Sequence, residues 1–184
     1  MRQLLLLLAV LTVGIFSTEA QEYRYAKRGY FGTARVSATN VYSIHTSSPG
    51  FSAEVINGYS FNKRFMMGVG VGVVNSNYKK EYNGTGNVRV PLYLHLRANV
   101  LDRKVTPYFT LNIGGGFCKG YQPPITDGAA EEINGSFGFY CLEPQVGVAV
   151  RLKGGRMLDL GLSLYSDVGR GFNGFPKLGI GFTW

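Results

Sequence analysis

Across residues 88–101, apolar and polar side chains alternate without interruption. One face of this segment carries Val88, Val90, Leu92, Leu94, Leu96, Ala98 and Val100. The other face carries Arg89, Pro91, Tyr93, His95, Arg97 and Asn99. A period of two indicates a β-strand, because successive side chains of a strand point to opposite faces. The segment exceeds the about five or six residues of a typical strand and the roughly 9–11 that a strand needs to cross a bilayer.

Seven further segments repeat this pattern and differ in how they are connected. They span residues 30–40, 51–61, 65–75, 106–117, 137–152, 157–167 and 174–184. The connections after the second, fourth and sixth strands are short, whereas the others are longer, the longest running from Lys119 to Ser136. Short turns at one end and long loops at the other are typical of an outer-membrane barrel. We therefore predict an all-β fold, an eight-stranded antiparallel up-and-down transmembrane β-barrel.

The composition excludes two other classes of protein. Only 16% of the residues are Asp, Glu, Lys or Arg, while Gly, Tyr and Phe number 26, 12 and 12. A soluble domain has about 25% charged residues, so this composition excludes a soluble helical bundle and favours strands. The net charge of +8 suggests nucleic acid as a partner, but no basic run exceeds two adjacent residues. Because no basic stripe is present, we expect no nucleic-acid binding.

The first 20 residues have the pattern of a secretory signal peptide. A short basic start is followed by a predominantly apolar run of 13 residues, from Leu4 to Phe16, and by Ala20 before the expected cleavage site. Thirteen residues are too few for a membrane-spanning helix, which needs about 20. We expect residues 1–20 to be removed, residues 21–29 to form a short periplasmic segment and residues 30–184 to form the barrel in a Gram-negative outer membrane.

Alternation alone does not say which face of the strands points inward. In a lipocalin-like soluble barrel, the apolar face lines the interior instead. Glycine is frequent on the polar face, lysine is almost absent from the strands except for Lys177, and the chain ends with Phe182 and Trp184. These features favour polar faces that line a narrow lumen and apolar faces that contact lipid. The soluble barrel is the alternative.

Several short motifs resemble a known family. They are Val90-Pro91-Leu92-Tyr93-Leu94, Val105-Thr106-Pro107-Tyr108-Phe109, Gly114-Gly115-Gly116-Phe117 and Glu143-Pro144-Gln145-Val146-Gly147-Val148. With them, the chain from about Tyr30 to Trp184 resembles the outer-membrane β-barrel domain family of Bacteroidetes, related in architecture to small OmpA/OmpX-type barrels. The resemblance implies this fold and export route and no catalytic residues. The aromatic C-terminal strand, with Phe182 and Trp184, resembles the signal read by the barrel-assembly machinery.

Polar faces that point inward bring charged residues together in the lumen. The expected network is Arg35, Glu54, Arg89, His95, Arg97, Glu143, Arg151, Asp159 and Lys177. Buried charges need partners, and eight strands leave an interior that side chains can fill. We therefore predict internal salt bridges, with Glu54 and Glu143 among the acceptors. Because the network has five basic and three acidic residues, a narrow channel for small anions is the alternative.

Cys118 and Cys141, the two cysteines of the chain, lie on either side of the longest connection. Both share the phase of the lumen-facing residues, so we predict that they meet in a disulfide at the outer rim. Such a bridge would close a loop of 22 residues. Two separate thiols are the alternative, and the strand register decides between them.

Candidate catalytic and metal-binding residues are few. His45 lies among serines and threonines in the first long connection, and Asp127 or Glu131 are acids that a hydrolase could use with it. No nucleophile elbow or characteristic spacing accompanies them, so we expect no enzyme, with a lipid-modifying enzyme as the least favoured alternative. We expect His95 to be a hydrogen-bonded core residue. Two His and two Cys are too few for a metal site, and we expect no cofactor.

The expected partners follow from the expected location in the outer membrane. Outer-membrane lipid, the barrel-assembly machinery during biogenesis and an unidentified extracellular ligand of the loops are the partners we expect for a monomer. Basic residues at the short turns are Lys63, Arg64, Arg103, Lys104, Lys153 and Arg156. Aromatic residues at the same level are Tyr30, Tyr59, Phe61, Phe65, Phe182 and Trp184. The basic turns either attract anionic phospholipid headgroups or are ordinary solvated turns.

Overall fold

The computed structural model describes residues 29–42, 47–76, 87–119, 136–168 and 172–184, most of which lie in strands. The strands are β1 (Gly29–Tyr42), β2 (Ser47–Ser60), β3 (Phe65–Ser76), β4 (Asn87–Asn99), β5 (Val105–Lys119), β6 (Ser136–Arg151), β7 (Met157–Val168) and β8 (Phe172–Thr183). A 3-10 turn, η2 (Lys153–Gly155), connects β6 to β7. In the described part of the chain, we find no helix with the length and hydropathy to span a bilayer.

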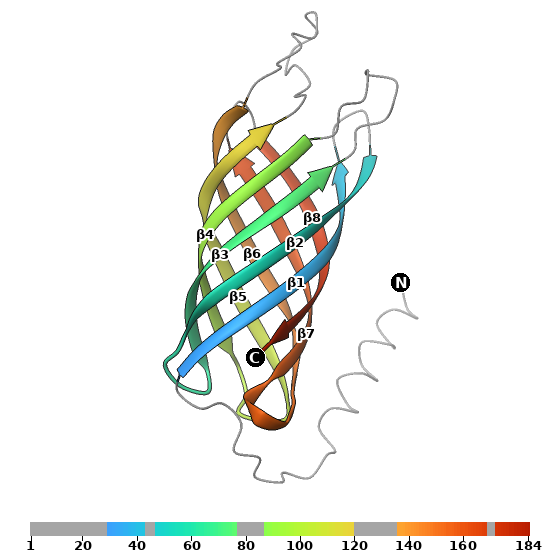
Figure 1. Cartoon of the computed structure of the whole chain (residues 1–184). Helices are drawn as coiled ribbons and strands as arrows, with labels where there is room; N and C mark the ends of the chain where they lie inside the picture. The colour runs from blue at the N-terminus through green and yellow to red at the C-terminus, as the bar shows by residue number, and fades with distance from the viewer. Residues whose placement is uncertain (1–28, 43–46, 77–86, 120–135, 169–171) are drawn as a thin grey trace, which may run out of the picture.

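The strands form one closed antiparallel barrel, as Figure 1 shows. Each strand pairs with its neighbours in sequence, and β1 closes the ring by pairing with β8, from Thr33–Thr183 to Thr39–Lys177. We call the end with residues 61–64, 100–104 and 152–156 the turn end, and the opposite end the loop end. The predicted all-β, eight-stranded antiparallel barrel is confirmed.

Burial alternates along each strand, as the period of two predicts. In β7, Asp159 and Asp167 are buried, whereas Leu160 and Leu162 are more than half exposed. The same alternation holds in β4. Arg89, Tyr93 and the other residues of their phase are buried, whereas Val88, Val90, Leu92 and Leu94 are exposed. Polar faces therefore point inward and apolar faces outward, and the soluble, inside-out barrel is excluded.

Glycine is required at two kinds of position. At Gly114, which faces the lumen, a Cβ atom would lie 2.5 Å from the Cα of Tyr93 on β4, so the two backbones approach too closely for a side chain. At Gly154 and Gly155 the φ angles are +76° and +81°, in the left-handed region that favours glycine. The first position keeps the lumen narrow, and the second makes the tight connection between β6 and β7.

Two apolar clusters lie inside the barrel, one in each half. The loop-half cluster consists of Val74, Cys118, Phe139, Cys141, Tyr165 and Phe175. The turn-half cluster consists of Phe31, Ile56, Met66, Tyr93 and Met157. Polar and charged side chains occupy the interior between and beside these clusters.

The strand limits agree with the expected segments to within a few residues. The largest difference is in β2, which begins at Ser47 rather than at residue 51. The expected signal peptide, residues 1–20, and the remainder of the chain before Gly29 lie outside the described residues. The same holds for most of each long connection, including His45, Asp127 and Glu131.

Candidate functional site

The nine residues expected to form a lumen network all lie inside the barrel. Each of them is at most 3% exposed: Arg35, Glu54, Arg89, His95, Arg97, Glu143, Arg151, Asp159 and Lys177. They come from six strands, β1, β2, β4, β6, β7 and β8, and each strand contributes side chains of one phase to the interior. They form four groups, stacked from the turn end to the loop end.

The first group lies at the turn end and includes Asp102, in the connection between β4 and β5. Arg151 Nη1 lies 2.5 Å from Asp102 Oδ1, and Lys63 Nζ lies 2.8 Å from Asp102 Oδ2. Arg151 also donates to the carbonyl oxygen of Lys63 at 2.7 Å. Desolvation opposes ionisation of Asp102, but hydrogen bonds from Lys63 and Arg151 outweigh it, so the pKa of Asp102 lies below its ordinary value.

The second group is centred on Asp159 of β7, which lies between two guanidinium groups. Arg97 Nη1 is 3.0 Å from Asp159 Oδ2, and Arg35 Nη2 is 3.5 Å from Asp159 Oδ1. The hydroxyl of Tyr108 donates to Asp159 Oδ1 at 3.3 Å and accepts a hydrogen bond from Gln145 Nε2 at 2.9 Å. Two positive charges and one negative charge leave this group with a net charge of +1.

The third group is centred on Lys177 of β8, which lies between two carboxylates. Lys177 Nζ forms ion pairs with Glu54 and, at 2.9 Å, with Glu143 Oε1. Tyr93 donates to Glu54 Oε2 at 2.9 Å, and Ser163 donates to Glu143 Oε1 at 2.6 Å. The net charge of this group is −1, so it balances the second group.

His95 belongs to the edge of the third group. Its Nδ1 lies 2.7 Å from Asn112 Oδ1, and Asn112 Nδ2 in turn lies 3.5 Å from Glu143 Oε2. Because the amide oxygen can only accept, His95 donates from Nδ1. The expectation of a hydrogen-bonded core histidine matches this placement.

The fourth group is an ion pair near the loop end. Arg89 Nε on β4 lies 2.8 Å from Asp167 Oδ2 on β7, and both side chains are buried. The Arg89 guanidinium also lies 6.0 Å from the centre of the Phe175 ring in the loop-half cluster. An ion pair and an aromatic cluster therefore occupy the lumen together at this height.

Two acidic residues of these groups were missing from the expected network. Asp167 shares the phase of Asp159 on β7, so continuing the alternation by one more pair would have included it. Asp102 lies in a turn, where alternation carries no information. With Asp167, the buried charges of the groups are five basic residues, Arg35, Arg89, Arg97, Arg151 and Lys177, and four acidic ones, Glu54, Glu143, Asp159 and Asp167, and each of them is ion-paired. The exposed Asp102 pairs with Arg151 and with Lys63 at the turn end. The excess of basic residues that suggested an anion channel therefore falls from two to one in the described interior.

The expected disulfide is not formed, and the register explains why. Cys118 and Cys141 are both free and buried in the loop-half cluster. Cys141 pairs with Gly114, four residues before Cys118 on β5, and Cys118 pairs with Phe137. Four residues along a strand correspond to about 13 Å, whereas disulfide-bonded Cα atoms lie within about 7 Å. The shared phase was correct, but it does not fix the height of a residue in the barrel.

The outer wall is apolar around the whole barrel. Exposed Val, Leu, Ile, Phe and Met side chains occur on β2 to β8, and β1 adds Val36. At the turn end, Phe182 stacks on Trp184 with ring centroids 6.2 Å apart, and Tyr30 meets Tyr59 edge-on at 5.8 Å. Aromatic side chains at the rim of an apolar belt are typical of the interface between hydrocarbon and water. Phe182 and Trp184 lie in this rim, on the outer surface.

Comparison with solved structures gives the same fold. The chain is similar to Neisserial surface protein A, with a TM-score of 0.63 and 16% identity over 84% of this chain and 96% of that one. It is also similar to Ail, the attachment invasion locus protein of Yersinia pestis solved with the heparin analogue sucrose octasulfate (TM-score 0.48, 14% identity, 86% and 100% covered). The outer membrane enzyme PagL gives a TM-score of 0.47 with 12% identity over 83% of this chain and 97% of that one.

These neighbours include small eight-stranded outer-membrane β-barrels, one of them an enzyme. At these identities the likeness shows the fold alone. No known family model matches the chain, and no curated protein matches its sequence.

Proposed function

We propose that this chain is an integral outer-membrane β-barrel whose polar lumen is filled, and that it acts structurally or through its extracellular loops in adhesion or surface interaction. One observation carries the proposal: a continuous apolar outer wall surrounds an interior in which nine buried charged side chains are ion-paired. A closed ring of strands leaves no unpaired edge, as hydrocarbon requires. We also propose that the chain comes from a bacterium of the Bacteroidetes.

The outer-membrane location has two kinds of support. The first is the outward apolar belt with its aromatic rim at Tyr30, Tyr59 and Trp184. Exposure of such a belt to water is unfavourable, whereas its contact with lipid is favourable. The second is the export pattern of residues 1–20. A chain that leaves the cytoplasm with such a surface is best accommodated in the outer membrane.

A structural role is favoured over transport because large side chains reach into the described interior and its buried charges are ion-paired. Tyr93 and Tyr108 reach into the lumen with their hydroxyl groups bonded to Glu54 and Asp159. Glycines on neighbouring strands leave room for these rings, since a Cβ atom on Gly147, which pairs with Tyr108, would lie 2.6 Å from the Tyr108 hydroxyl oxygen. An eight-stranded barrel has an interior that side chains fill, which agrees with this packing.

Conductance in a planar lipid bilayer tests this proposal against the narrow channel. The purified barrel is expected to give no unitary opening steps at neutral pH, whereas a wide porin reconstituted in the same bilayer gives them. Reproducible steps with anion selectivity from the folded barrel would overturn the filled lumen and establish the channel. Lipid turnover by the purified barrel that is lost in His45→Ala would establish an enzyme instead.

A further inference from the structure

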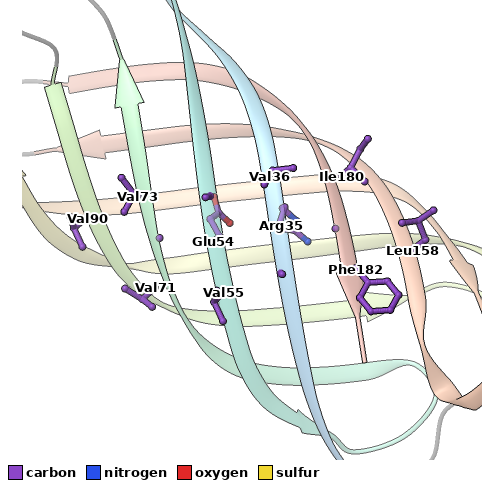
Figure 2. Close-up of a pocket in the computed structure, with 14 residues that line it drawn as sticks. Arg35, Val36, Glu54, Val55, Val71, Val73, Val90, Leu158, Ile180 and Phe182 are labelled. Carbon is purple, nitrogen blue, oxygen red and sulfur yellow. The ribbon is translucent and has the colours of Figure 1, made fainter.

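A groove of about 540 Å³ crosses the apolar outer wall. Figure 2 shows it lying between two rows of side chains. The row nearer the turn end consists of Leu158, Phe182, Ala34, Val55 and Val71, which are opposite one another on successive strands. The row nearer the loop end consists of Ile180, Val36, Ala53, Val73 and Val90. The groove therefore runs across the strands rather than along one of them.

The floor of the groove is backbone. Gly72 and Gly181 have no side chains, and the Arg35 and Glu54 side chains, each 3% exposed, are directed into the lumen. In each row the smallest side chain is an alanine, Ala34 in one and Ala53 in the other. These features make the groove a narrow apolar cleft on the outer surface, and it is open to the surroundings along its whole length.

The groove is oblique to the barrel and begins at the turn end. Leu158 is the second residue of β7, next to the turn end, whereas Val90 is the fourth residue of β4, next to the loop end. Between them the groove crosses β8, β1, β2 and β3, and strands lie about 4.8 Å apart, so its length is about 24 Å. A narrow apolar groove of this length suits one extended hydrocarbon chain.

We call the end of the groove at Leu158 and Phe182 its mouth; an aromatic and a basic residue lie two positions beyond it along the strands, Trp184 after Phe182 and Arg156 before Leu158. Trp184 and Arg156 each lie one residue beyond the last pair of β7 and β8, Met157–Thr183. The Trp184 ring lies over Gly32 of β1, because a Cβ atom there would be 2.6 Å from its Cε2 atom. Arg156 is exposed, as is Lys153 three residues before it. The mouth therefore combines an aromatic ring at the interface with two positive charges.

The charge of the turn end is strongly unbalanced. In its described connections the exposed basic residues are Lys63, Arg64, Arg103, Lys104, Lys153 and Arg156. Asp102 is the acidic residue of these connections, and it already bonds to Lys63 and Arg151. The remaining positive charge of these turns attracts anions, and anionic lipid headgroups at a membrane surface are one source of them.

We propose that this groove binds one anionic phospholipid of the leaflet at the turn end, with an acyl chain in the groove and the phosphate at Arg156 and Lys153. The proposal rests on the membrane insertion proposed above. The rows of apolar side chains match the hydrocarbon chain, and the two positive charges at the mouth match the phosphate. A zwitterionic lipid fits the groove equally well but is not held by net charge at the mouth.

Trp184 provides the test, because it is the one tryptophan of the sequence. The mature barrel is reconstituted in mixed vesicles that contain phosphatidylglycerol or phosphatidylcholine with brominated acyl chains, and quenching of Trp184 fluorescence gives the relative binding constant of the two lipids. We expect phosphatidylglycerol to bind roughly fivefold or more tightly at low salt, and the preference to fall as salt is added.

Matched variants separate the site from general surface charge. Arg156→Gln with Lys153→Gln is expected to bring the ratio of the two binding constants close to one. Arg103 lies at the turn end in the connection between β4 and β5, away from the groove. Arg103→Gln is expected to remove a charge without changing the ratio of the two binding constants. Ala34→Leu, which fills the groove, is expected to weaken quenching by both brominated lipids, whereas Ala38→Leu on the same face of β1 lies outside the groove and does not.

The outcomes distinguish this inference from the proposal beneath it. Equal binding of the two lipids by the wild type, or an equal effect of Arg103→Gln and of the double variant Arg156→Gln with Lys153→Gln on the ratio, would overturn the lipid site while leaving membrane insertion intact. No quenching of Trp184 by either brominated lipid would mean that the barrel is not inserted, and the proposed function would fail first.

Discussion

Arg97 on β4 and Asp159 on β7 form an ion pair of 3.0 Å across the lumen, although β5 and β6 separate their strands along the wall. The Arg97 guanidinium also lies 4.1 Å from the centre of the Tyr108 ring, and Tyr108 hydrogen-bonds to the same aspartate. Side chains of the interior therefore connect strands that are not neighbours in the barrel. Their ion pairs stabilise the barrel in addition to filling its interior.

The first prediction concerns Asp159. Asp159→Asn leaves Arg35 and Arg97 buried without their shared carboxylate, and breaking a buried ion pair in this way typically costs about 3–5 kcal/mol. We expect the free energy of unfolding to fall by about that amount. Denaturant unfolding of the barrel in lipid vesicles, followed by the fluorescence of Trp184, measures it.

Asp102→Asn is the matched control, because it makes the same chemical change at the exposed turn end. The Asp102 side chain is 34% exposed, so solvent screens its ion pairs and we expect a loss of about 1 kcal/mol or less. Equal losses for the two variants would contradict a lumen in which Asp159 holds the walls together.

The second prediction is a pH dependence that originates from Asp102. Its pKa is lowered in the folded barrel, so its ion pairs contribute stability above the pKa of the unfolded chain, about 3.9, and lose it as pH falls through the folded pKa. The difference in unfolding free energy between wild type and Asp102→Asn should be constant from about pH 5 to about pH 8 and shrink below about pH 4. A difference that grows on acidification would show that the sign is wrong.

The third prediction concerns the close approach at Gly114. A Cβ atom there would lie 2.5 Å from Tyr93 Cα, and backbone cannot move aside as a flexible side chain can. We expect Gly114→Ala to lower the free energy of unfolding by about 1–3 kcal/mol, as overpacking does. Gly138→Ala is the control, because its Cβ atom would meet one carbonyl oxygen at 3.9 Å. Similar stability of the two variants would argue against tight packing in the lumen.

The fourth prediction concerns the two thiols. Because the register keeps Cys118 and Cys141 apart, both are expected to react with a maleimide-linked polymer after unfolding without reductant, giving a protein that carries two labels. In the folded barrel both thiols are buried and should be protected. Labelling of the unfolded protein that requires prior reduction would indicate a bridge and therefore another register.

Sequence periodicity predicted the barrel because each strand carries its own signal. In β4 and β7, side chains of one phase are apolar and those of the other are polar, so strand number and connection lengths follow without knowledge of the register. The glycines of the polar face and the scarcity of lysine then indicated which face points inward. The same signal placed Arg35, Glu54 and Lys177 in the interior. These properties depend on phase alone, and phase is local.

Pairing across the lumen was beyond the reach of that signal. Whether Asp159 meets Arg97 or Arg89 depends on the stagger of the strands around the closed barrel, which no single segment encodes. The same stagger separates Cys118 from Cys141. Asp102 was missed because the alternation of inward and outward side chains does not continue into a turn. The residues were predictable, but their partners were not.

Gel mobility of the outer-membrane fraction, boiled and unboiled in detergent, tests the central claim most directly. A closed barrel with paired strands and a tied interior resists cold detergent, so the unboiled protein is expected to run at a different apparent mass from the boiled one, with no change on adding reductant. Asp159→Asn should lose the unboiled form at a lower temperature. Recovery of the protein in the soluble fraction, with one mobility before and after boiling, would contradict an integral outer-membrane barrel.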